Sequence, residues 1–260
     1  MYDIIEAMKF PEKKIIMFDL DDTLSEAKTP MLPSMGEALT ELLKHAHVAV
    51  ITGGKWEQCK LQTIDQMPET SKIMLHRLHI LPNCGTRLYQ YVDEEWKSVY
   101  AELLSSEEKI HIKEALEKSM IGMYDASTLY GDIIEDRESS MAFSALGQQA
   151  PIEIKKSFDP DKKIRLRMLE RLIPMLPNHE VKIGGTTTID ITKKGMDKGW
   201  GIKRFAEHMS FTLPEIGFVG DALFPGGNDY PAKEIGLHCV EVKGPHETEA
   251  HIRRWSRNEE

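Results

Sequence analysis

The feature that most constrains this chain is a short apolar run, Ile15–Phe18, that ends abruptly in Asp19, Asp21 and Asp22. An apolar run with a sharp polar end predicts a buried parallel strand. Asp19 and Asp21 then follow the carboxyl end of that strand, where open α/β sheets bind their ligands. Their side chains point the same way and repel each other unless a cation or a shared proton intervenes. The alternative is a solvated acidic turn, because aspartate is common in turns.

Three later segments also place polar side chains at the ends of apolar runs or helices. His47–Gly54 is an apolar run that ends in Thr52 and two glycines, a pattern that can cradle an anion. Gly195–Trp200 places Lys198 in a glycine-flanked turn that opens a helix. Glu215–Asp229 contains a third apolar run, which ends at Asp221, with Asp229 one loop later.

This order of an acid pair, a threonine, a lysine and a final acid resembles the haloacid dehalogenase-like (HAD) phosphotransferase superfamily, and the resemblance covers nearly the whole chain. Its four motifs match Asp19 with Asp21, Thr52, Lys198, and Asp221 with Asp229. The insertion between Thr52 and Lys198 looks like the type IIB cap, and the loop from Gly220 to Asp229 is most similar to that of eukaryotic-type phosphomannomutases. The resemblance implies an α/β fold, with a Rossmann-like parallel-sheet HAD core and an inserted α+β cap domain.

The hydrophobic pattern predicts where this insertion lies. A chain of 260 residues is long enough for about two domains. A helix expected over 34–46, with a capping box formed by Ser34 and Glu37, gives a βαβ unit before Thr52. From about residue 100 the pattern changes to two helices and about four short strand-like runs. We therefore expect a core over 1–99 and 194–260 and a cap over 100–193. The basic run in the cap is expected to be a solvated helix face, made by Lys162, Lys163, Arg165 and Arg167.

Composition narrows the class of protein. The formal net charge of −9 argues against a large nucleic-acid footprint, and no apolar run approaches the length that spans a membrane. The three cysteines are far apart and form no Cys-x-x-Cys pair, which favours reduced thiols in the cytoplasm. Asp3 and Glu6 argue against a signal peptide. The expected partner is a small phosphorylated substrate, and a homodimer is compatible with these features.

The resemblance also implies a role for each core residue. Asp19 would attack phosphorus and form an aspartyl-phosphate, while Asp21 would act as general acid and base. Thr52, Gly53 and Lys198 would bind the phosphoryl oxygens. Mg²⁺ is the expected cofactor, because it prefers carboxylate and water oxygens. The expected direct ligands of the metal are Asp19, Asp221 and the backbone carbonyl of Asp21. Asn228 and Asp229 are the expected outer residues of the metal site.

The cap is expected to select the substrate. Arg137 matches a residue that contacts the distal phosphate in phosphomannomutases, but Gln148 stands where a second arginine is expected, and Lys155 lies near the place of a third. The stretch that contains Thr188 and Asp190 resembles the sugar-contacting segment. A neutral amide in place of an arginine weakens the binding of a second phosphate group. The alternative for Arg137 is a surface ion pair with a neighbouring glutamate.

Three functions fit these residues. The favoured one is a Mg²⁺-dependent phosphatase of sugar phosphates or similar small metabolites, because the second cap arginine is missing. The alternative is a phosphomannomutase, which would use the same aspartyl-phosphate and return the phosphoryl group to the sugar. The third is a catalytically silent binding module, against which the complete acid set argues, since repelling carboxylates serve no purpose there.

Overall fold

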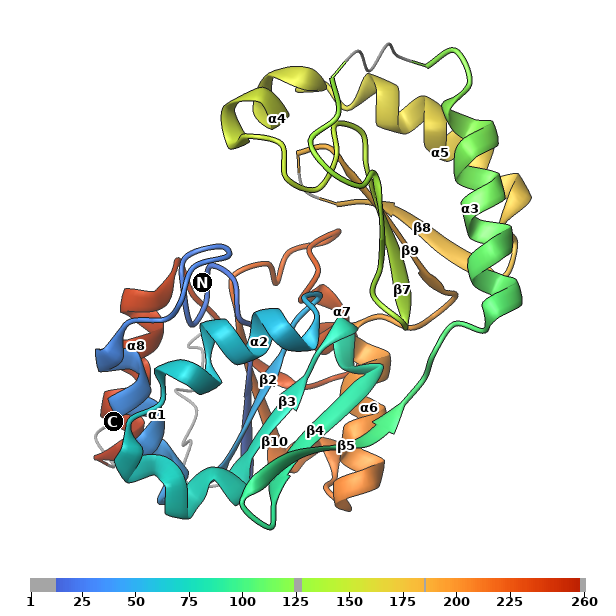
Figure 1. The fold of residues 1–260 in the computed structure, drawn as a ribbon. Coiled ribbons are helices and arrows are strands. Elements are labelled where there is room, and N and C mark those ends of the chain that lie inside the picture. The colour runs from blue at the N-terminus through green and yellow to red at the C-terminus, as the bar shows by residue number, and fades with distance from the viewer. Residues whose placement is uncertain (1–12, 124–127, 185, 258–260) are drawn as a thin grey trace, which may run out of the picture. The chain divides into compact units, whose positions relative to one another are not determined.

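In a computed structural model of the chain, the described residues are 13–123, 128–184 and 186–257. Asp3 and Glu6 lie outside these ranges. The chain divides into two compact units (Figure 1). Unit 1 contains the chain up to Ala101 and again from Asp197, and unit 2 is the stretch Glu102–Met196 between them. The expected domain junctions lie two or three residues from these boundaries.

Unit 1 is built on a seven-stranded sheet in the order β11-β10-β1-β2-β3-β4-β5. The five strands from β11 to β3 pair in parallel, and β4 and β5 add an antiparallel hairpin at one edge. Its strands are β1 (Ile15–Phe18), β2 (His47–Ile51), β3 (Leu78–Leu81), β4 (Arg87–Val92), β5 (Glu95–Ala101), β10 (Ile216–Gly220) and β11 (His238–Glu241). Strands β1, β2, β3 and β10 are mostly apolar and buried, as expected for strands covered on both faces, whereas the edge strand β11 is partly exposed.

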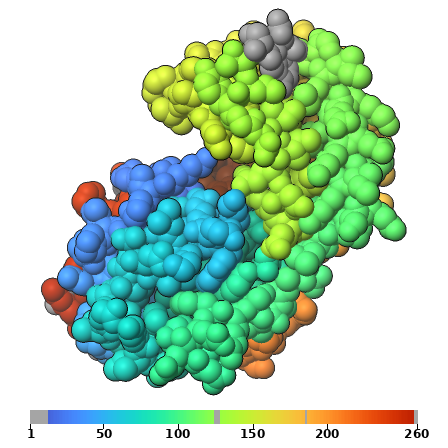
Figure 2. All heavy atoms as spheres, in the orientation of Figure 1, coloured from blue at the N-terminus to red at the C-terminus, as the bar shows by residue number. Residues whose placement is uncertain are grey.

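The helices of unit 1 cover both faces of this sheet. They are α1 (Pro33–Leu43), α2 (Trp56–Gln62), α6 (Lys198–Met209), α7 (Tyr230–Glu234) and α8 (Pro245–Ser256). Short 3₁₀ segments lie at η2 (Ile64–Gln66), η3 (Glu69–Arg77), η4 (Asn83–Gly85) and η5 (Leu213–Glu215). Figure 2 shows α2 and the β4–β5 hairpin at the surface of unit 1 on the face in view.

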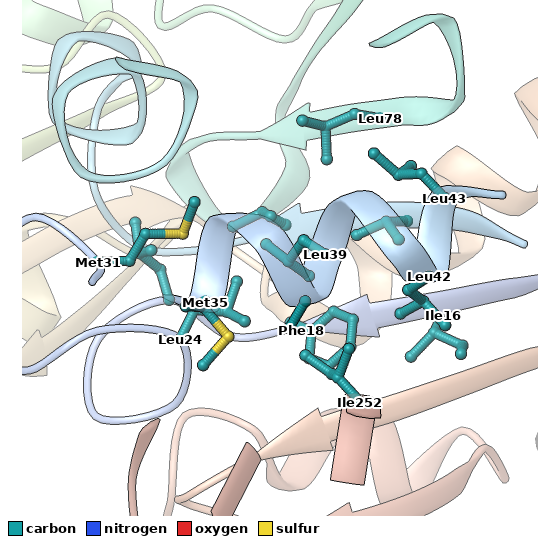
Figure 3. Packing of buried hydrophobic residues seen from close by; sticks show 14 of the residues in the cluster. Ile16, Phe18, Leu24, Met31, Met35, Leu39, Leu42, Leu43, Leu78 and Ile252 are labelled. Atoms are coloured by element: carbon teal, nitrogen blue, oxygen red, sulfur yellow. The ribbon is translucent and has the colours of Figure 1, made fainter. Parts of the chain in front are cut away.

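Two apolar layers hold these helices to the sheet. On one face, Leu39 and Leu42 of α1 pack with Phe18 of β1 and Ile252 of α8 (Figure 3). On the other face, Ile202 and Phe205 of α6 belong to a second buried cluster. Burying a leucine, isoleucine or phenylalanine side chain contributes about 1.5–3 kcal/mol, so these layers fix the sheet between its helices.

Unit 2 is a small α+β unit with a four-stranded antiparallel sheet in the order β6-β7-β9-β8. Its strands are β6 (Ile134–Asp136), β7 (Ser140–Ser144), β8 (His179–Ile183) and β9 (Thr188–Lys193). Its helices are α3 (Ser106–Met120), α4 (Ile152–Phe158) and α5 (Lys163–Met175), one more than predicted. Among the described residues of the chain, no helix is long and apolar enough to cross a bilayer.

Two local predictions were wrong because a side-chain partner outside the local sequence pattern decides each outcome. Arg165 is not on a solvated face: it is buried, and its Nε lies 3.0 Å from Asp159 Oδ2. Ser34 forms no capping box with Glu37, because α1 begins at Pro33 and the Ser34 hydroxyl donates to Glu249 of α8. Proline suits the first turn of a helix, which moves the start away from the predicted cap.

Candidate active site

The predicted core residues follow the carboxyl ends of neighbouring parallel strands. Asp19 comes directly after β1, Thr52 after β2 and Asp221 after β10, and these three strands are adjacent in the sheet in the order β10-β1-β2. Lys198 is the first residue of α6. The carboxyl edge of a parallel sheet is where α/β folds place their ligands, so the strand order explains why these residues share one region.

Lys198 lies between two carboxylates. Its Nζ is 2.6 Å from Asp19 Oδ1 and 2.6 Å from Asp229 Oδ1, and all three side chains are almost fully buried. Asp229 also accepts a hydrogen bond from the backbone N–H of Ala222, at 3.1 Å. Asp229 is thus fixed at both of its oxygens, and it holds the lysine beside Asp19.

Burial and charge shift the ionisation of this group in opposite directions. Burial raises the pKa of Asp19 above its usual value, and the positive charge of Lys198 opposes that rise. Burial alone would lower the pKa of Lys198, but Asp19 and Asp229 more than offset this and raise it. The lysine is therefore a permanently charged group that is buried away from water, where its attraction for a phosphoryl oxygen is strong.

Close backbone packing fixes the start of α6. The Asp197 side chain caps the helix by accepting from the Trp200 N–H at 2.9 Å. Gly201 in the first turn packs against Gly85 of η4: a Cβ on Gly85 would lie 2.7 Å from the Gly201 Cα, and one on Gly201 would clash with the Cys84 carbonyl. Two glycines therefore let the helix start approach the turn after β3.

Three carboxylates could hold a cation. Oxygens of Asp19, Asp221 and Asp229 all lie within 4.8 Å of one another. Burial and the negative charge of Asp229 raise the pKa of Asp221, and Thr23 Oγ1 donates to its Oδ1 at 3.3 Å. The set offers only hard oxygen ligands and carries more negative charge than Lys198 balances, which fits Mg²⁺. Asn228 is exposed.

The Asp21 carboxylate is not part of this carboxylate group. Its Oδ1 accepts from the Lys28 backbone N–H at 2.8 Å and from Gln62 Nε2 at 3.0 Å, and Gln58 Nε2 lies 3.4 Å from Oδ2. We did not predict the two glutamines from the sequence. A signal was present in their spacing, because residues four apart in a helix share one face.

Thr52 and Gly53 form the turn after β2. The Thr52 side chain is buried, and its Oγ1 accepts from the Gly54 N–H at 3.1 Å. Gly53 is exposed. This turn precedes α2, so it has the hydroxyl and the backbone N–H groups of the expected anion cradle.

In unit 2, Arg137 lies between two carboxylates. Its Nε is 2.9 Å from Glu135 Oε2, and its Nη1 is 3.4 Å from Asp190 Oδ1. The ion pair with a neighbouring glutamate that was expected as the alternative is therefore present. Asp190 is itself in close contact with Gly184, where a Cβ would clash with its carboxylate.

Gln148 and Lys155 form a second pair in unit 2. Lys155 Nζ donates to the Gln148 backbone carbonyl at 2.8 Å. The Gln148 Nε2 is buried and has no hydrogen-bond partner within the part of the chain that the structure describes. Thr188 begins β9, and its backbone carbonyl accepts from the Gly184 N–H.

The sequence matches the family described as eukaryotic phosphomannomutase over residues 35–256. The chain belongs to this family. A phosphomannomutase of Encephalitozoon cuniculi is 26% identical over 245 residues, covering 91% of each chain. A phosphomannomutase of Schizosaccharomyces pombe is 28% identical over 232 residues, covering 87% of each chain. The relatives of the phosphomannomutase family thus span nearly the whole protein.

Solved structures support the HAD fold. A haloacid dehalogenase-like hydrolase from Bacteroides thetaiotaomicron superposes with a TM-score of 0.64 at 14% identity, covering 93% of this chain and 99% of its own. An IMP-nucleotidase from Plasmodium falciparum gives 0.71 at 16% identity, covering 94% and 69%. Fold and family identify a HAD-type enzyme. The names of the relatives favour the mutase, the alternative from the sequence, over the favoured phosphatase.

Proposed function

We propose that this protein is a Mg²⁺-dependent phosphotransferase that exchanges a phosphoryl group between the 1- and 6-hydroxyls of a hexose phosphate. The proposal of phosphoryl transfer is supported by the buried group in which Lys198 bridges Asp19 and Asp229, with Asp221 nearby. Family membership over residues 35–256 supports the mutase over other transfers.

Asp19 is the proposed nucleophile, because its carboxylate has the Lys198 ammonium at 2.6 Å to draw a phosphoryl oxygen toward it. Lys198 and Thr52 then bind the oxygens over which charge spreads during transfer. Asp21 gives a proton to the leaving oxygen and takes one back from the accepting hydroxyl.

Mg²⁺ would be held by Asp19 and Asp221 with the Asp21 carbonyl. When bound, it would neutralise the negative charge of these carboxylates, which otherwise repels a phosphate. Asp229 and Asn228 are its proposed outer residues. In unit 2 we propose Arg137, Gln148, Lys155, Thr188 and Asp190 as substrate-binding residues. The cysteine pattern supports a reducing, cytoplasmic setting.

A second candidate is hydrolysis of the sugar phosphate. Two features of unit 2 favour it: Gln148 replaces a cation, and Arg137 already pairs with the carboxylates of Glu135 and Asp190. Both features weaken retention of the sugar after its phosphoryl group has passed to Asp19. Once the sugar has left, water would attack the aspartyl-phosphate, which would release inorganic phosphate and restore the Asp19 carboxylate.

The test is to incubate the protein with mannose 1-phosphate or glucose 1-phosphate and Mg²⁺, with and without hexose 1,6-bisphosphate, and to follow products by ³¹P NMR. A mutase yields the 6-phosphate with little inorganic phosphate, and bisphosphate speeds the reaction. Stoichiometric inorganic phosphate would assign the phosphatase instead. The matched control is Asp19→Asn, which should form neither product.

A further inference from the structure

We propose that Gln62 is a positioning residue that sets the direction of the Asp21 carboxylate, with Gln58 assisting from one helical turn earlier. The inference rests on the proposed function, in which Asp21 moves the proton. It is carried by a specific arrangement: the side chains of both glutamines leave α2 toward the same carboxylate, and each donates to a different oxygen of it.

The Gln62 amide is built into the loop that carries Asp21. Its side chain is only 1% exposed, and besides Asp21 its Nε2 lies 2.9 Å from the Thr29 carbonyl and 3.1 Å from Ser25 Oγ. The Gln62 backbone carbonyl accepts from the Met31 N–H as well. These contacts tie the segment from Asp21 to Met31 to the end of α2.

The orientation of this amide is fixed by its acceptors. A carboxylate, a carbonyl and a hydroxyl all lie at Nε2, while Oε1 is buried with no hydrogen-bond partner in the part of the chain that the structure describes. Leaving a buried carbonyl unsatisfied is unfavourable, so the amide is held in this direction by what it donates to.

A neutral amide suits a carboxylate that must also act on substrate. An amide that donates to a carboxylate has no net charge of its own, whereas lysine or arginine adds a full positive charge that attracts the carboxylate further. An amide donor therefore orients the carboxylate without holding it as tightly as a cation would. In the proposed transfer, the bond from phosphorus to the leaving oxygen breaks as the Asp19–phosphorus bond forms, and the Asp21 proton moves to that oxygen.

The leaving group distinguishes positioning of Asp21 from a general structural role. A sugar oxygen is a poor leaving group that needs a proton, whereas an aryl oxide leaves readily without one. We would therefore measure the first phosphoryl transfer to Asp19 in single-turnover experiments with a hexose phosphate and with a small aryl phosphate. The variants are Gln62→Met and Gln58→Met, and the control is Gln66→Met, since Gln66 donates to the Leu61 carbonyl instead of to Asp21.

Gln62→Met should slow transfer from the hexose phosphate by about ten- to a hundredfold, while the aryl phosphate step changes by no more than about threefold. Gln58→Met should have the same selectivity with a smaller loss, because its contact is longer, and Gln66→Met should match the unmodified protein. In an Asp21→Asn background, Gln62→Met should add nothing.

Gln62→Glu keeps the size of the side chain and places a second carboxylate against Asp21, so it serves as a second test if Gln62→Met unfolds. It should cost more on the hexose phosphate than Gln62→Met does, because like charges repel at this distance. If Gln62→Met slowed transfer from both substrates equally, or slowed it further in the Asp21→Asn background, the inference would be overturned and the proposed function would stand. Undiminished turnover by Asp19→Asn would overturn both.

Discussion

The ammonium nitrogen of Lys198 lies 2.6 Å from Oδ1 of Asp19, and both side chains are almost completely buried. A buried ion pair adds little net stability, because the loss of hydration offsets the attraction between the charges. Removing one partner is costly, since the other charge stays behind without compensation. The pair is therefore better explained by the reaction at Asp19 than by the needs of the fold.

We expect Asp19→Asn to keep the fold and to lose turnover by at least about 10³-fold, because an amide is not a comparable nucleophile. The amide oxygen can still accept from Lys198, so the melting temperature should stay close to that of the unmodified protein. Phosphate release and hexose phosphate isomerisation would both be measured. Near-native activity in either assay would exclude the aspartyl-phosphate route.

Lys198→Met should lower the free energy of unfolding by about 3 kcal/mol and abolish transfer, because Asp19 and Asp229 lose their shared cation. Urea denaturation followed by circular dichroism checks the stability. Lys203→Met is the matched control, because Lys203 is an exposed lysine on the same helix. If the two variants unfolded at the same urea concentration, the buried ion pairs would not be present in solution.

Adding Mg²⁺ should raise the melting temperature, because the cation binds the folded carboxylates and not the unfolded chain. At a concentration about a hundred times the Kd, the gain is about 2.7 kcal/mol. The effect should be reversed by a chelator and be absent in Asp221→Asn. An equal rise in that variant would mean that the ion binds elsewhere.

Stability should fall with acid because of a histidine pair on strands β2 and β3. His79 Nε2 lies 3.0 Å from His47 Nδ1, and Gln90 lies against the other His79 nitrogen. Burial, with smaller contributions from the neighbouring histidines, lowers the pKa of His79 to about 3. The unfolded chain then binds more protons than the folded one between about pH 6.5 and about pH 3, so stability is complete above this window and is lost as pH falls through it.

The histidine effect can be measured as the slope of unfolding free energy against pH, which reaches about 1.4 kcal/mol per pH unit for one proton. His79→Leu should reduce the slope between pH 6.5 and 4. His45→Asn is the control, because His45 is exposed on the segment between α1 and β2. A slope that His79→Leu leaves unchanged would refute the assignment.

Gln148→Arg should raise the ratio of isomerised sugar phosphate to inorganic phosphate. One charge-assisted contact contributes about 1.5–3 kcal/mol, which corresponds to about ten- to a hundredfold in binding. Gln149→Arg is the matched control, because the adjacent side chain is exposed. If both variants gave the same product ratio, the position of Gln148 would have no part in retaining a second phosphate.

The sequence was sufficient to predict the strand ends that carry Asp19, Thr52 and Asp221, because each prediction needs only a local apolar run and its polar end. The hydrogen bond from Gln62 to Asp21 joins residues that are 41 positions apart. The contact of Arg165 with Asp159 depends on how the chain turns before α5. Periodicity cannot reveal such partners. The same limit explains Ser34, whose hydroxyl is used by Glu249 215 residues later.

The contact of Gly85 with Gly201 has an evolutionary consequence. One glycine follows β3 and the other lies in the first turn of α6, more than a hundred residues later in the chain. The two backbones lie so close together that neither position has space for a Cβ atom. A methyl group at either position would push α6 outward and draw the Lys198 ammonium away from Asp19. Selection should therefore keep glycine at both positions, although a glycine has no side chain that could take part in the reaction.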